Sequence, residues 1–238
     1  MTYEEKIIKE LHTWQHQMLR NPSWLNNKTR RVQTKINNLI PEKAHRVITA
    51  TIKQMVQGVL FGAQHTTAPP VADTTLAVRE TLAQEKIKFY RKTSAIEGGI
   101  TGAGGILLGL ADFPLLLALK IKLLFDIASL YGYSTGNYKE RVYLLHIFQL
   151  AFSGQEHRKK IYLKMLHWDE QMNRLPDKPG DFDWRSFQQE YRDYIDLAKM
   201  AQLIPVVGAP IGAMVNYQLV KKLGITAMNA YRLRWFEK

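Results

Sequence analysis

Histidines at helical spacing are the first residues in this sequence that could do chemistry. His12 and His16 are four residues apart, so on a helix both imidazoles face one side and could share a metal ion. The glutamate of a zinc-protease motif is missing between them, and the flanking glutamines are poor ligands. His167 precedes Asp169 by two residues, a pair suited to acid–base work, but no motif points to a substrate. We therefore expect no catalytic residue, no metal and no cofactor.

Closely spaced glycines are a second candidate, because glycine-rich loops bind phosphate. The spacing within residues 102–109 fits neither the P-loop nor the dinucleotide fingerprint, and no Gly-Lys-Ser/Thr follows. A nucleophile elbow is also missing. Glycines four residues apart instead let two helices approach closely, either in a membrane or in an ordinary helical core. The glycines with this spacing are Gly98 and Gly102, Gly105 and Gly109, and Gly208 and Gly212.

Apolar residues recur at helical spacing along almost the whole chain, and no run alternates with a period of two. The pattern predicts an all-α fold: a single multi-helix bundle over 1–238, with basic helices in 1–92 and two Gly-rich apolar hairpins with connecting helices in 93–238. Ile7, Leu11, Trp14 and Met18 form one face of a first helix, which Pro22 ends. Further helices are predicted at 24–40, from Pro41 onward, at 73–92, 138–152 and 155–172, around 184–195, and at the carboxyl end.

Asp112 marks the first of the two Gly-rich segments. Because Pro114 suits a first helical turn, Asp112 is predicted to cap a new helix, so that two helices meet there. In the second segment, Met200 to Val220, Asn216 aligns with Asp112, which suggests an internal repeat of the hairpin. A final helix is expected after Gly224. As an alternative to paired caps, Asp112 and Asn216 could line a pocket together with Arg141.

Positive charge is the main clue to partners. The net charge is +12, and residues 1–92 hold 15 basic against 7 acidic side chains, so nucleic acid or an anionic membrane surface is favoured. No nucleic-acid motif is present, and specific nucleic-acid binding is not expected. A solvated basic surface is the plain alternative. The predicted contact residues are Lys28, Arg30, Arg31 and Lys35, and Arg158, Lys159 and Lys160.

The first Gly-rich segment is too interrupted to span a bilayer, since Glu97, Asp112 and Lys120 divide it. The second contains two prolines and Asn216 and is only modestly apolar. An interfacial hairpin stays open as an alternative. The chain has no cysteine and its first residues lack the apolar core of a signal peptide, which predicts a protein on the cytosolic side.

Three sequence blocks resemble the EcsC protein family. They are "GGITGAGGILLGLADFPLLLALKIKLLFDIASLYGY", "YKERVYLLHIFQLA" with Arg141, and "IPVVGAPIGAMVNYQLVKKLGITAMNAYRLR". The similarity covers the chain from about Lys86 onward. The family takes its name from a bacterial protein encoded beside the ATPase and permease of an ABC transporter, and it brings no active site to carry over.

The resemblance implies a bacterial accessory or adaptor protein that works near an ABC transporter. Together with the positive charge, it predicts a protein peripheral to the inner face of the cell membrane, whose partners are ABC transporter components and anionic lipid. Basic helices would contact the headgroups, and the Gly-rich hairpins would pack together or enter the interface. The alternative is an enzyme or binding protein that acts on a lipid or another amphipathic ligand.

Overall fold

The computed structural model describes residues 1–20, 42–61, 68–102, 105–178, 181 and 209–237. Within these ranges the chain forms helices joined by turns, and no β-strand, which confirms the predicted all-α class. The helices are α1 (Tyr3–Leu19), α3 (Glu42–Phe61), α4 (Leu76–Gly102), α5 (Gly105–Leu130), α6 (Tyr138–Phe152), α7 (Gln155–Met165), α8 (Trp168–Met172) and α11 (Ala209–Phe236).

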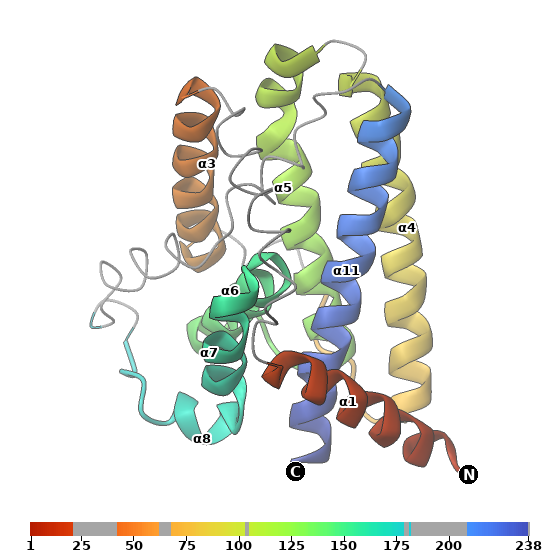
Figure 1. Ribbon diagram of the computed structural model, residues 1–238. Coiled ribbons are helices and arrows are strands. Elements are labelled where there is room, and N and C mark those ends of the chain that lie inside the picture. Colours follow the sequence, from red (N-terminus) through yellow and green to blue (C-terminus); the bar gives the residue numbers. More distant parts are fainter. Residues whose placement is uncertain (21–41, 62–67, 103–104, 179–180, 182–208, 238) are drawn as a thin grey trace.

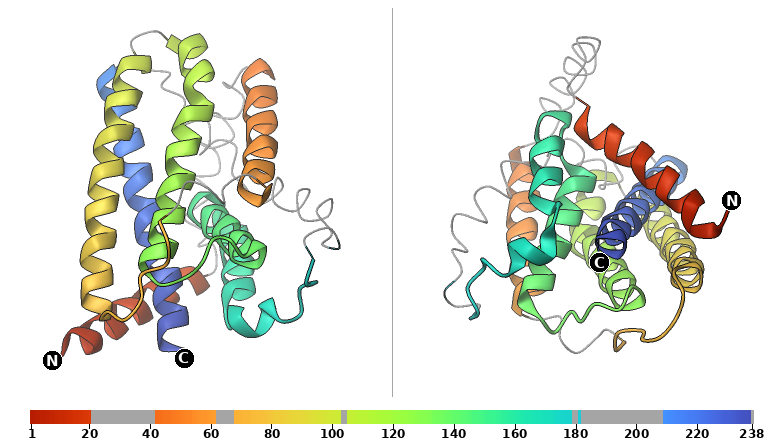
Figure 2. Two further views of the ribbon diagram at one scale, coloured as in Figure 1. Left: turned by 180° about the vertical axis from the view of Figure 1, so that it is seen from behind. Right: turned by 90° about the horizontal axis from the view of Figure 1, so that it is seen from below.

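Three long helices, α4, α5 and α11, stand side by side and form the centre of the molecule (Figure 1). α11 runs antiparallel to α4: Arg232 meets Glu80 at one end, and the Arg91 guanidinium lies 3.8 Å from the Tyr217 ring centre nearer the other. α3 packs on the opposite side of α5 from α4, whereas α1 crosses the lower end of the bundle beside α7 (Figure 2). Because α11 contacts α1 as well as α4, it joins the first and last described helices of the chain.

The first helix forms as its sequence predicts. Thr2 and Glu5 make a reciprocal capping box at its start, which satisfies two amide groups that the helix leaves free. Ile7, Leu11 and Trp14 are buried, and Met18 packs at the edge of the same core. The Trp14 ring meets Tyr162 of α7 edge-on, with ring centres 5.7 Å apart. This apolar face holds α1 across the bundle.

The predicted helix break at Asp112 is wrong, because α5 continues through Asp112 and Pro114 without interruption. Proline removes one intrahelical hydrogen bond and crowds the carbonyl four residues earlier. That penalty is offset here by packing: Phe113, Leu116 and Leu117 around the proline are buried in the core. Asp112 is thus an interior helix residue and not a cap.

The expected start of a separate helix after Gly224 is also wrong, since α11 is one helix from Ala209 to Phe236. Gly224 faces α4, where a Cβ atom would lie 2.4 Å from Cγ1 and 2.6 Å from Cδ1 of Ile87. Any side chain at this position would have to displace the side chain of Ile87. This glycine therefore permits the close approach of α4 and α11, a role that the four-residue glycine pairs had been expected to fill.

Replacing Gly224 with alanine is expected to lower the free energy of unfolding by about 1–2 kcal/mol, because overpacking against Ile87 outweighs the gain in helix propensity. Adding Ile87→Ala should cost less than the two single changes summed, since it removes the contacted atoms. Urea unfolding measures both. Gly58→Ala on α3, where a Cβ would meet nothing within 4 Å, is the control and should stabilise the protein. A Gly224→Ala variant as stable as Gly58→Ala would contradict this account.

Two other boundaries differ from the predictions. α4 continues to Gly102, ten residues beyond the predicted end at Lys92. The helix predicted over 155–172 is divided into α7 and α8, because His167 adopts a left-handed conformation with φ of 51°. The helices predicted at 24–40 and around 184–195 fall outside the described residues.

Candidate functional site

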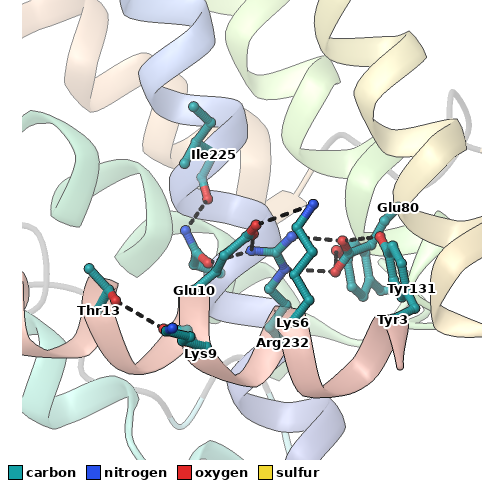
Figure 3. Close-up of polar contacts among 10 residues, drawn as sticks. Tyr3, Lys6, Lys9, Glu10, Thr13, Glu80, Tyr131, Ile225 and Arg232 are labelled. Carbon is teal, nitrogen blue, oxygen red and sulfur yellow. Dashed lines mark hydrogen bonds and ion pairs between the residues drawn. The ribbon is translucent and has the colours of Figure 1, made fainter. Parts of the chain in front are cut away.

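A buried ion pair fastens α4 to α11 at the lower end of the bundle (Figure 3). The Arg232 guanidinium donates two hydrogen bonds to the Glu80 carboxylate, through Nε and Nη2, both at 2.7 Å. Glu80 is fully buried and also accepts hydrogen bonds from the hydroxyls of Tyr3 at 2.7 Å and Tyr131 at 3.3 Å. Arg232 extends further to Glu10, at 3.4 Å. Side chains from α1 and α11, together with Tyr131 just after α5, thus converge on the Glu80 carboxylate of α4.

A second buried arginine, two residues further along α11, holds the helices on the other side. Arg234 donates to Glu140 of α6 at 2.7 Å and, through Nε, to Asp169 of α8 at 3.0 Å. Tyr231 donates to the other oxygen of Glu140, at 2.7 Å. The guanidinium also lies over the Tyr133 ring, 3.7 Å from its centre. Arg234 is consequently surrounded by carboxylates and aromatic rings.

These two clusters hold the fold together and do not resemble an acid–base pair. Burial raises the pKa of Glu140, and Arg234 counteracts that shift by favouring the ionised carboxylate. Burial and the contact with Glu80 raise the pKa of Tyr3 to about 12, and burial raises that of Tyr133 to about 12 as well. The tyrosines therefore stay protonated at neutral pH. Asp169 pairs with Arg234, and Nδ1 of His167 lies 3.8 Å from a carboxylate oxygen of Glu237.

Lys120 is fully buried between α5 and α11. Its ammonium Nζ donates to the Leu116 carbonyl and to Oδ1 of Asn216, both at 3.1 Å. Neither partner carries a charge, and burial lowers the pKa of Lys120 to about 7. The lysine that interrupts the apolar segment in the sequence thus faces the protein interior. Asn216 holds its side chain there and does not cap a helix.

The pocket suggested for Asp112, Asn216 and Arg141 stays a prediction, and the structure gives hydrogen bonds for two of its three side chains. Nη1 of Arg141 donates to the carbonyls of Thr135 and Gly136 in the turn before α6, at 2.7 and 2.8 Å. Asn216 bonds instead to Lys120, in the middle of the long helices. Arg141 therefore fastens a turn, and burial lowers the pKa of its guanidinium.

Only some of the basic residues predicted to contact a membrane lie in the described ranges. Lys28, Arg30, Arg31 and Lys35 lie outside the described residues. Among the cations of α7, Lys160 is exposed, whereas Arg158 and Lys159 are half-buried, and burial lowers the pKa of Arg158. Of the predicted packing glycines, Gly208 lies outside the described residues. The others lie near helix ends: Gly98 and Gly102 in α4, Gly105 and Gly109 in α5, and Gly212 in α11.

An apolar surface on α4 is the feature that the sequence reasoning missed. Val78, Leu82, Phe89 and Ile96 are 47%, 36%, 60% and 63% exposed, although all four are large and apolar. Their spacing of four, seven and seven residues places them within about 40° on one face of the helix. We call these four residues the α4 stripe. A signal was present in the sequence, since α4 carries this second apolar stripe beside the one that enters the core.

Charged side chains border the α4 stripe. Lys86 and Lys88 are exposed on either side of it, whereas Glu85 and Lys92, also exposed, lie on the same face between its apolar residues. An apolar helix face flanked by lysines is typical of helices that lie in a membrane interface. In the described ranges, none of the helices is both long enough and apolar enough to cross a bilayer.

Comparison with known proteins gives the chain its relatives. Residues 5–236 match the model of the EcsC protein family. Protein EcsC of Bacillus subtilis (strain 168) is 42% identical over 235 residues, which cover 98% of this chain and 97% of that protein. The uncharacterized protein YdbA of the same organism is 30% identical over 159 residues, 67% of this chain and 58% of its own length. No solved structure matches the chain. The match along nearly its whole length means that the chain belongs to the EcsC protein family.

Proposed function

We propose that this protein is a non-enzymatic accessory protein that binds the anionic, cytoplasmic face of the cell membrane beside an ABC transporter. The α4 stripe carries the membrane part of this proposal. The membrane contact is assigned to α4 because its exposed apolar residues follow one helix face and lysines border them. The basic segment around Lys28, assigned to the membrane from its sequence, is a further contact of the same kind.

The physical argument combines two contributions. Apolar side chains that leave water for the headgroup–acyl boundary gain about 25 cal/mol per Å² of buried apolar surface. Each lysine near an anionic surface adds about 1 kcal/mol, an attraction that salt weakens. The α4 stripe from Val78 to Ile96 is about 27 Å long at 1.5 Å per residue. A helix of this length lying flat would give reversible attachment.

The transporter part of the proposal depends on family membership. The EcsC family is named after a protein encoded beside an exporter's ATPase and permease, and such neighbours commonly act together. No ATPase motif occurs in this sequence, so the proposed role is to assist or regulate a transporter and not to power it. Co-purification of the chain with a permease–ATPase pair from detergent-solubilised membranes would test this part separately.

Flotation with liposomes tests the membrane contact. Wild-type protein should float with vesicles containing phosphatidylglycerol and not with phosphatidylcholine alone, and rising salt should release part of it. The double variant Phe89→Ser/Ile96→Ser should lose most of this binding, at least about tenfold, because it removes the two most exposed residues of the α4 stripe.

Leu163→Ser is the matched control for that variant. Leu163 is also exposed, at 46%, but it lies on α7 and outside the α4 stripe, so its replacement should leave flotation unchanged. Circular dichroism and thermal unfolding establish that all variants are folded. Equal flotation of the wild type and the α4 double variant would remove α4 from the proposed contact, and a wild type that floats with neither vesicle would refute the membrane proposal.

A further inference from the structure

A groove between α3 and α5 is a feature of the described surface that the proposed function does not use. It has a volume of about 550 Å³, within the range of small-molecule sites. Its walls are mainly apolar: Met55, Val59, Leu117, Ile121 and Phe125 contribute side chains. Pro114, which lies in an unbroken helix, is part of one wall. The α4 stripe belongs to a different helix surface, so the two features are separate.

The groove suits an acyl chain better than a peptide. A helix with its side chains is about 10–12 Å across, and a segment of only three turns exceeds this volume. An extended peptide would bury amide groups that need partners, yet the polar side chains in the wall are only Thr51, Gln54 and Lys122 among the described lining residues. A hydrocarbon chain needs no such partners.

Lys122 gives the groove its charge preference. Its ammonium forms an ion pair with Asp126, which also accepts a hydrogen bond from Tyr90 at 2.9 Å and lies 3.6 Å from the Lys86 ammonium. Two cations thus share one carboxylate, and the cluster has one positive charge in excess. Lys122 is one-third exposed and lines the groove. An anionic headgroup at this wall would balance that charge.

We infer that the groove between α3 and α5 binds a single-chain amphiphile, with its acyl chain along the apolar walls and its anionic headgroup at Lys122. A fatty acid and a lysophospholipid share this chemistry. The inference does not depend on the membrane proposal, because none of the residues that line the groove belongs to the α4 stripe. A groove variant should float with vesicles as the wild type does, and a variant of the α4 stripe should still bind the amphiphile.

Gly58 offers a direct way to fill the groove. It lies on the groove wall, and a Cβ there would meet no atom within 4 Å, so a larger side chain can project into the open space without a clash. Gly58→Phe should weaken binding of cis-parinaric acid, a fluorescent 18-carbon fatty acid, at least tenfold, while the melting temperature is unchanged or higher. Gly58→Ala, which leaves most of the groove open, is the matched control and should bind nearly as the wild type does.

Competition against cis-parinaric acid identifies the ligand chemistry. Saturated fatty acids from 10 to 16 carbons should bind about fourfold more tightly per added methylene until the groove is full. Lys122→Met should weaken the binding of fatty acids about tenfold but leave the binding of the corresponding alcohols unchanged. Lys160→Met serves as its control, because Lys160 is an exposed cation on α7 that does not line the groove. Lysophosphatidic acid compared with the fatty acid of equal chain length tells which headgroup is preferred.

Two results would overturn the inference. One is a wild-type protein that does not bind cis-parinaric acid or lysophosphatidic acid. The other is a Gly58→Phe variant that binds as tightly as Gly58→Ala, because the ligand then lies elsewhere. An equal loss of fatty acid and alcohol binding in Lys122→Met would refute the headgroup position.

Discussion

Replacing Glu80 with glutamine should reduce the free energy of unfolding by about 3–5 kcal/mol, which is a large part of the stability of an ordinary protein. The glutamine keeps the shape of the side chain but removes its charge. Arg232 would then remain buried with no ionised partner except Glu10, which is about half exposed. In a chain of this size the expected fall in melting temperature is roughly 6–20 °C.

Two further variants separate the ion pair from the packing around it. Glu80→Leu combined with Arg232→Met removes both charges and should be less destabilising than Glu80→Gln alone, although the Tyr131 hydroxyl loses an acceptor. Glu10→Gln, at the exposed end of the cluster, should change the stability by less than about 1 kcal/mol. Urea unfolding measures all three. If Glu80→Gln is as mild as Glu10→Gln, the cluster does not stabilise the fold as described.

Replacing Lys120 with methionine should have the opposite effect and raise the free energy of unfolding by roughly 3–4 kcal/mol at pH 6. Burial lowers the pKa of Lys120 to about 7, whereas in the unfolded chain it is 10.5. The unfolded state therefore binds more protons between these values, and stability rises with pH across that window. Below pH 7 the full penalty, about 5 kcal/mol at 1.36 kcal/mol per unit, opposes folding. Methionine removes this penalty and loses the two hydrogen bonds of Nζ, to the Leu116 carbonyl and to Asn216.

The pH dependence of the stability difference tests the state of Lys120 more directly than its size at one pH does. The difference in stability between Lys120→Met and wild type should shrink by about 2–3 kcal/mol from pH 6 to pH 9, because the wild-type lysine becomes neutral in the folded state first. Measurements above that range would add the tyrosines, several of which have raised pKa values. Lys160→Met, at an exposed position of α7, should show no such trend. A constant difference between Lys120→Met and wild type would mean that Lys120 remains charged in the folded protein.

Local patterns in the sequence predicted most of the helices, and long-range contacts explain where they failed. The face of α1 and the range of α6 follow from apolar spacing and from cap residues, Thr2 for α1 and Asn137 for α6. The breaks expected at Asp112 and Gly224 do not occur, because proline and glycine signals describe a helix in isolation. Packing around Pro114 and against Ile87 overrides them here.

The buried charges could not be predicted from spacing. Glu80 and Arg232 are 152 residues apart in the chain, and each looks like an ordinary surface residue of an amphipathic helix. Lys120 has the same ambiguity: in the sequence it only interrupts an apolar run. The α4 stripe was predictable in principle, because Leu82, Phe89 and Ile96 repeat every seven residues on a face that the core does not need. The groove could not be foreseen, since it depends on the separation between α3 and α5.

The 152-residue separation of Glu80 and Arg232 also has a consequence for biosynthesis. α11 follows every other described helix, so α4 emerges from the ribosome long before the helix that covers it. At a translation rate of about 5–20 residues per second, roughly 8–30 s pass between the synthesis of Glu80 and that of Arg232. During that interval the surface of α4 that later contacts α11 is uncovered and open to chaperones or to aggregation. The contacts between α4 and α11 should therefore form late, once α11 has been translated, and slowly because they are non-local.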